Sequence, residues 1–267
     1  MSGQITGRRG LERLDEELSG RDRSILGQVA DLRLMSARQI EIVHFAAAEH
    51  ATAISAARCC RRVLERLVRD RLLTRLERRI GGVRAGSALY GYAIGPVGQR
   101  LVGRDEARKR FREPSATYAL HTLAFAPLVT DLTVQSRSGR GEILQLQAEP
   151  ACWRTTTGMA GSTLLRPDLF VSLGIREYEY RWLIEVDLGT EHLPTLLRKC
   201  QAYEAYYRSG REQHEHGVFP RVLWLMHSAE RVERLQAAIA SDTRLTSALF
   251  SIVTSEQAIT AVAGASS

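Results

Sequence analysis

Ten arginines fall between Ala56 and Arg84, against only three acidic residues. That local excess equals the net charge of the whole 267-residue chain, which is +7. Only two of the 37 basic residues are lysines, a bias that a GC-rich genome explains. Genome composition does not explain why the charge gathers in one segment. The positive charge is therefore concentrated in one segment of the chain. A basic segment of this kind is typical of proteins that bind nucleic acid.

The first half of this segment has the period of an amphipathic helix, from about Ser55 to Arg71. Its apolar residues recur on one face, and these are Ala56, Cys60, Val63, Leu64 and Leu67. The opposite face carries a stripe of five arginines, Arg58, Arg61, Arg62, Arg66 and Arg69. The spacing predicts a helix that packs through one side and presents guanidinium groups on the other.

Two shorter helical patterns precede this helix, one from about Arg21 and one that Ser36 caps. Two strand-like runs follow it and flank a glycine-rich turn with three further basic residues, Arg78, Arg79 and Arg84. Three helices followed by a basic hairpin are the order of a winged helix-turn-helix. The sequence therefore predicts a winged-helix domain over residues 21–102, preceded by a mobile tail over residues 1–20.

The expected partner of the winged helix is double-stranded DNA. Guanidinium groups bind phosphate and guanine edges in a bidentate manner. A helix with one arginine face and one apolar face meets what a recognition helix requires. The alternative is an ordinary solvated helix face in an arginine-rich protein.

A charged stretch that ends in proline, residues 103–114, predicts a linker, and a second domain follows over residues 115–260. Its order is one helix, three strands, a helix, a strand, a helix and a last strand. This order predicts an α/β domain with a mixed sheet. The chain as a whole is thus expected to be a two-domain α+β protein.

Three carboxylates mark the ends of strands in this second domain. Asp168 begins one strand, and Glu185 and Asp187 point to the same side of the next strand. Such carboxylates are suited to a divalent cation that prefers oxygen ligands. The alternative is that they end strands and cap loops.

The pattern Pro167-Asp168, a spacer and then Glu185 resembles the PD-(D/E)xK nucleases, a restriction-endonuclease-like fold. The resemblance implies that Asp168 and Glu185 bind the metal, with Mg²⁺ as the expected ion. Asp187 stands where that motif has lysine, so the sequence departs from it there. Lys199, on the following helix, is the expected substitute. The implied catalytic set is therefore Asp168, Glu185, Asp187 and Lys199, unless the site is inactive.

A second resemblance covers most of the chain. The segment EVDLGTE at residues 185–191, with Lys199, Tyr203 and the later run FPRVLWLM, is similar to the replication-relaxation family. The resemblance implies a DNA-binding protein of a plasmid or other mobile element, acting in replication, relaxation or mobilisation. It implies no particular reaction.

The remaining expectations come from composition. The chain is 44% hydrophobic and 25% charged, and it has no apolar run long enough to cross a membrane, so we expect a cytoplasmic protein. Two other functions stay open: a Mg²⁺-dependent DNA endonuclease, and a winged-helix transcriptional regulator. A homodimer is the expected assembly for the regulator, because winged helices often pair on two-fold sites.

Overall fold

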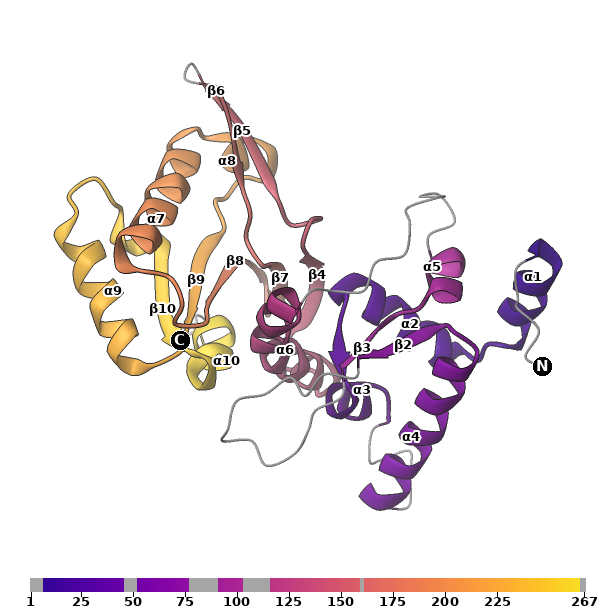
Figure 1. Cartoon of the computed structure of the whole chain (residues 1–267). Coiled ribbons are helices and arrows are strands. Elements are labelled where there is room, and N and C mark those ends of the chain that lie inside the picture. Colours follow the sequence, from indigo (N-terminus) through magenta and orange to yellow (C-terminus); the bar gives the residue numbers. More distant parts are fainter. Residues whose placement is uncertain (1–6, 46–51, 77–90, 103–115, 159–160, 265–267) are drawn as a thin grey trace. The chain divides into compact units, whose positions relative to one another are not determined.

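The structure is a computed structural model that describes residues 7–45, 52–76, 91–102, 116–158 and 161–264 (Figure 1). Its contacts divide the chain into two compact units, Met1–Ala126 and Pro127–Ser267. Both units combine helices with a sheet, so the predicted α+β class is confirmed. The division falls inside one helix, whereas the predicted linker at residues 103–114 lies outside the described residues.

The first unit contains the three predicted helices and the two predicted hairpin strands. Its elements are α1 (Arg8–Glu17), α2 (Gly20–Leu32), β1 (Met35–Ser36), α3 (Ala37–His44), α4 (Ala53–Arg69), β2 (Leu73–Leu76), β3 (Gly91–Ile94) and α5 (Pro96–Val102). The strands form an antiparallel sheet in the order β1-β3-β2. The predicted tip of the hairpin lies outside the described residues.

The expected mobile tail differs from the structure, in which Arg8–Glu17 form helix α1. Leu14 and, just after the helix, Leu18 are both buried. An ion pair one turn apart, between Arg8 and Glu12, adds local support on the exposed side. The sequence prediction missed this short amphipathic helix because charged residues surround its few leucines.

Helix α4 packs as its period predicts, and it is also held by an ion pair. Ala56, Cys60, Leu64 and Leu67 are buried on its apolar face. On the other side Arg66 donates to the buried Asp22 at 2.6 Å. Asp22 also caps α2, because its Oδ2 accepts from the backbone and hydroxyl of Ser19. Burial raises the pKa of Asp22, but the bonds from Arg66 and Ser19 outweigh it and lower the pKa overall.

Replacing Arg66 with alanine should therefore destabilise the first unit. Asp22 would lose its charged partner while remaining buried, at a cost of about 1–2 kcal/mol. Arg62→Ala, one turn earlier and exposed, should change the free energy of unfolding by less than about 0.5 kcal/mol. Urea unfolding of both variants tests this expectation, and equal losses would contradict the bracing role of Arg66.

The second unit is built on one mixed sheet. Its elements, with the helix that leads into it, are α6 (Ala116–Arg137), β4 (Glu142–Ala148), β5 (Arg154–Gly158), β6 (Gly161–Leu165), β7 (Leu169–Ile175), β8 (Tyr178–Asp187), α7 (Leu193–Arg208), α8 (Arg211–His216), β9 (Arg221–Met226), α9 (Ala229–Ser241), η2 (Ser247–Leu249), β10 (Phe250–Thr254), η3 (Ser255–Gln257) and α10 (Ala258–Ala263). The strand order is β10-β9-β8-β7-β4. Strands β8, β9 and β10 run parallel, and β4, β7 and β8 pair antiparallel.

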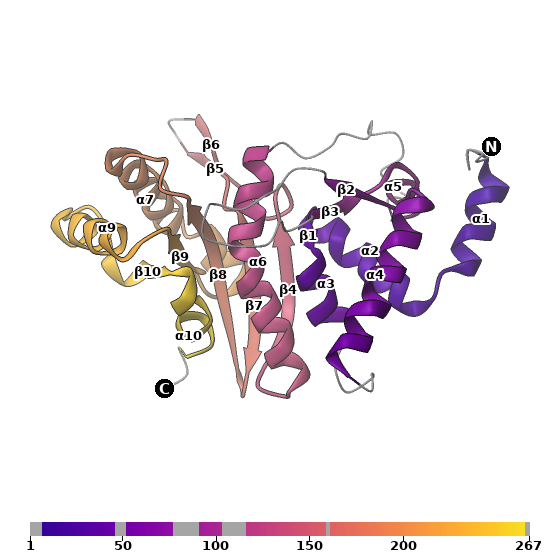
Figure 2. The same cartoon turned by 60° about the horizontal axis from the view of Figure 1, so that its bottom comes forward.

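Helices cover both faces of this sheet (Figures 1 and 2). Helices α7 and α9 pack on the face that carries Phe170, Leu183 and Trp224. The part of α6 that belongs to this unit, residues 127–137, and helix α10 lie on the opposite face (Figure 2). Strand β8 is central and hidden by helices on both sides, which explains its unbroken run of buried residues from Trp182 to Asp187.

The predicted strands and helices of this unit are present, with longer bounds in several cases. The β5–β6 hairpin, α8 and α10 were not expected. Residues 211–216 have the composition of a polar loop, but they form α8, in which Glu212 is buried. No helix in the described part of the chain is long and apolar enough to span a membrane.

Candidate functional site

The acidic cluster lies where β7 and β8 meet helix α7. Strand pairing sets Leu169 opposite Ile184, and the Asp168 backbone N–H donates to the carbonyl of Ile184 at 2.9 Å. Just before the paired part of the strand, the Asp168 side chain accepts from the backbone N–H of Val186 at 2.7 Å, and its charge acts on Glu185. The structure therefore brings the predicted metal-binding pair together.

Glu185 is the centre of this cluster. Its side chain is buried, and the Tyr203 hydroxyl donates to Oε1 at 2.5 Å. The Lys199 ammonium lies 3.4 Å from Oε2. Lys199 also donates to Glu191 at 3.0 Å. The predicted partnership of Lys199 with Glu185 is thus present in the geometry.

Burial decides the protonation of these groups. It raises the pKa of Glu185 to about 7, against the pull of the Lys199 charge and with a smaller push from Asp168. Burial also raises the pKa of Tyr203 well above its ordinary value, so this phenol remains a donor at neutral pH. Burial lowers the pKa of Lys199, but the negative charges of Glu185 and Glu191 raise it by more. The pKa of Lys199 is therefore raised overall, and the side chain carries a positive charge.

The buried Glu185 predicts a specific dependence of stability on pH. Its folded pKa lies above the ordinary value of 4.5, so the folded state holds a proton that the unfolded state releases. Stability from this group is therefore present below about pH 4.5 and falls as the pH rises to about 7. Glu185→Gln removes that dependence.

Urea unfolding of the wild type and of Glu185→Gln between about pH 3.5 and about pH 8 measures the effect, because these limits lie about one unit outside the window from about 4.5 to about 7. The stability of the variant relative to the wild type should rise by about 1–3 kcal/mol across this range. Parallel curves would contradict the raised pKa.

Asp187 lies on the same face as Glu185, as the alternation predicted, but it contacts a different helix. Its side chain is fully buried and forms a two-pronged pair with Arg231 of α9. Its Oδ1 also accepts from the backbone N–H of Gly189 at 3.1 Å. Gly189 has φ +83°, which favours glycine at this position. The observed contacts of Asp187 are therefore those of a structural ion pair.

Sequence reasoning did not single out Glu191 and Arg231 as members of this network. Arg231 donates to the carbonyl of Glu191 at 2.6 Å, and Glu191 binds Lys199. The signal for Glu191 was present, because it is the last residue of EVDLGTE. No local pattern identifies Arg231, which is separated from Asp187 by 44 positions.

The donor set suits Mg²⁺ in chemical type. Mg²⁺ is commonly held by one or two carboxylates with water completing its shell. Asp168 and Glu185 would supply those carboxylates. Within the described residues no group of three or more His, Cys, Asp or Glu side chains is arranged to bind a metal. Both oxygens of Glu185 have protein partners, and the backbone N–H of Val186 donates to Asp168 at 2.7 Å.

The basic stripe on α4 divides into two groups. Arg66 is paired with Asp22, and Arg69 is paired with its neighbour Asp70 at 3.0 Å. The remaining three stripe members are exposed and form no ion pair with the described part of the chain; these are Arg58, Arg61 and Arg62. The three predicted hairpin arginines, Arg78, Arg79 and Arg84, lie outside the described residues.

Comparison of the sequence with models of protein families identifies the family of this chain. The model of the replication-relaxation family matches residues 26–222. The chain belongs to the replication-relaxation family. No curated protein and no solved structure matches it.

The family match runs from α2 to the start of β9, so it includes both α4 and the cluster around Glu185. The EVDLGTE segment of this replication-relaxation protein supplies three members of one connected network, Glu185, Asp187 and Glu191. Membership links the chain to replication and relaxation.

Proposed function

We propose that this chain is a DNA-binding protein of a plasmid or mobile element, acting in its replication, relaxation or mobilisation. In this proposal the first unit is a winged helix that binds double-stranded DNA. The second unit is a restriction-endonuclease-like domain. The observation that carries the proposal is the exposed triad Arg58, Arg61 and Arg62 on a helix that packs through its other face.

The order of elements supports the winged-helix assignment. Helix α2, strand β1, helices α3 and α4 and then the β2–β3 strands follow one another, and β1 joins the sheet beside β3. In a helix-turn-helix the N-terminal residues of the recognition helix reach the base edges. In α4, which has 17 residues from Ala53 with Thr52 as its cap, Arg58 is the member of the triad nearest to the N-terminus, and Arg61 and Arg62 lie in the middle of the helix.

Equilibrium binding of the full chain to duplex DNA over a range of salt concentrations tests the proposal. Phosphate contacts release counterions, so the affinity should fall steeply and linearly on a log–log plot. The slope counts the contacts at about 0.9 for each phosphate. Absence of binding at low salt, or binding with no salt dependence, would refute the proposal.

A second candidate function is Mg²⁺-dependent cleavage of DNA. The observation that favours it is the approach of Lys199 to Glu185 beside Asp168. A bound Mg²⁺ would supply a Lewis acid and an activated water. Asp168 and Glu185 would bind the Mg²⁺ ion, and the Tyr203 hydroxyl would hold Glu185 in place. The positive charge of Lys199 would lie next to the carboxylate of Glu185.

Incubation of supercoiled plasmid with the purified protein, with Mg²⁺, Mn²⁺ or EDTA, tests this candidate. Nicking or linearisation that needs the metal and disappears in Asp168→Asn supports it. Asparagine keeps the shape and an acceptor for the Val186 N–H, so its fold should be preserved. An intact plasmid with bound protein, or equal cleavage by the variant, counts against an enzyme.

A further inference from the structure

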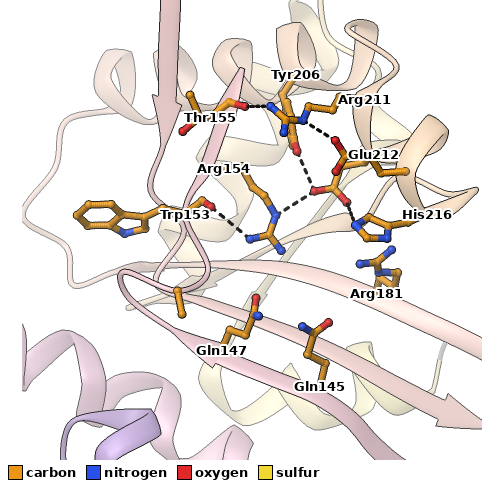
Figure 3. Close-up of a pocket in the computed structure, with 12 residues that line it drawn as sticks. Gln145, Gln147, Trp153, Arg154, Thr155, Arg181, Tyr206, Arg211, Glu212 and His216 are labelled. Carbon is orange, nitrogen blue, oxygen red and sulfur yellow. Dashed lines mark hydrogen bonds and ion pairs between the residues drawn. The ribbon is translucent and has the colours of Figure 1, made fainter. Parts of the chain in front are cut away.

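A cavity of about 410 Å³ opens on the second unit (Figure 3), and Asp168, Glu185 and Lys199 are not among the residues that line it. Residues of β4, β5, β8 and α8 line it. Three of the lining side chains are arginines, Arg154, Arg181 and Arg211, and the amides of Gln145 and Gln147 face them (Figure 3). The wall is therefore rich in hydrogen-bond donors.

Two of these arginines are balanced by carboxylates. Arg154 donates to the buried Glu212 at 2.9 Å, and Tyr206 donates to the same oxygen at 2.8 Å. Arg211 donates to Glu215 at 2.8 Å. These contacts hold the two guanidinium groups in place, and the two carboxylates neutralise most of their positive charge.

Arg181 has the weakest ion pair of the three arginines. Its side chain is only 8% exposed, and its Nε has no hydrogen-bond partner within the described ranges. The carboxylate nearest to it there is that of Glu179, at 3.6 Å, which is too long for a hydrogen bond. Glu179 is itself half exposed and accepts from the Ser172 hydroxyl at 2.6 Å.

A buried guanidinium with unused donors is costly unless an anion binds it. Packing fixes its position, because Arg181 lies 5.3 Å and Arg154 lies 4.9 Å from the ring centre of Phe170. Two cations thus converge on one ring beside the cavity. The site is prearranged for a compact anion with several acceptor oxygens.

We propose that this pocket binds a phosphate group of the DNA strand, with Arg181 as its principal ligand. The identification of the phosphate as that of DNA rests on the proposed function. Arg181 and Glu185 lie four residues apart on β8, on the same face of the sheet. At about 3.3 Å per residue this separation is about 13 Å along the strand. The pocket and the acidic cluster therefore lie on one face of the sheet, separated by the core that Leu183 forms with helix α7.

Thermal unfolding of the full chain with inorganic phosphate, against chloride at equal ionic strength, tests the anion site directly. Phosphate stabilises any protein to some extent by exclusion from its surface, so the comparison is between variants. The wild type should gain several degrees more in Tm than Arg181→Met, because ligand binding stabilises the folded state. Methionine keeps an apolar stem and removes a buried charge, so the variant should fold.

Arg221→Met is the matched control, because Arg221 is exposed and stacks on Trp182, on the other face of the sheet. It removes one charge from the same unit and should respond to phosphate like the wild type. Arg181→Lys keeps the charge without the two-pronged geometry and should give an intermediate gain. Equal gains in the wild type and Arg181→Met would overturn the site.

Binding to duplex DNA then tests the source of the phosphate. Arg181→Met should weaken the affinity about tenfold and lower the salt slope by about 0.9, and Arg221→Met should not. A phosphate-dependent gain in Tm without an effect on DNA affinity would overturn the DNA assignment. The Tm comparison uses inorganic phosphate and does not depend on the arginines of α4. The anion site can therefore be confirmed or refuted even if α4 does not bind DNA.

Discussion

Replacing Arg58, Arg61 and Arg62 together with alanine should lower the affinity for duplex DNA by about a hundredfold near 0.1 M salt, at about 1 kcal/mol for each exposed contact. These side chains form no ion pair with the described part of the chain, so their charge is available to phosphates. The salt slope should also fall by about 1 for each phosphate contact that is lost. Fluorescence anisotropy with a labelled duplex measures both quantities.

The matched control removes the same number of charges from the same unit. Arg8, Arg9 and Arg13 lie on α1, and Arg8 and Arg13 are already paired with glutamates. Their triple alanine variant changes the net charge equally and should keep most of the affinity. If the two triple variants lose affinity to the same degree, the general charge of the unit binds DNA and α4 has no special role.

Removing Arg231 should produce the largest loss of stability among the substitutions considered in the second unit. The Asp187 side chain is fully buried, and Arg231→Ala would leave it with only the Gly189 N–H. An uncompensated buried carboxylate lowers the free energy of unfolding by about 3–5 kcal/mol. Because Arg231 is partly exposed, we expect a loss at the lower end of that range. Chemical denaturation of the variant measures the loss.

Arg234→Ala is the natural control, because Arg234 lies on the same helix and pairs with Glu230 in solvent. That exposed pair should contribute less than about 1 kcal/mol. The double variant Asp187→Asn with Arg231→Met removes both charges and should recover much of the stability. Equal losses in Arg231→Ala and Arg234→Ala would show that the Asp187 pair is not a structural anchor.

Much of the fold could be predicted because it depends on local periodicity. The apolar positions of α4 identify its buried face, and the alternation in β8 places Glu185 and Asp187 on one side. Short elements with few apolar residues have no such periodicity, so the sequence did not predict them. Helix α8 has the composition of a polar loop, and only the long-range partners of Glu212, such as Arg154, show why it packs.

The candidate site could be predicted in part. Asp168, Glu185 and Lys199 come together because strand order and the following helix place them so, and the motif spacing already contains that information. The role of Asp187 depends on Arg231, and the role of Arg66 depends on Asp22, 44 positions away in each case. Sequence spacing does not report such pairs, so Arg66 was assigned to DNA and Asp187 to the catalytic set, although each has a partner within the chain.

In the proposed function, bound DNA lies against Arg58, Arg61 and Arg62 of α4. Photo-crosslinking of the full chain to a duplex carrying bromodeoxyuridine, followed by mass spectrometry of the crosslinked peptides, tests it most directly. Crosslinks should form to peptides that contain Arg58, Arg61 or Arg62, and they should disappear in the triple alanine variant. Crosslinks confined to the second unit, with none from α4, would contradict the claim.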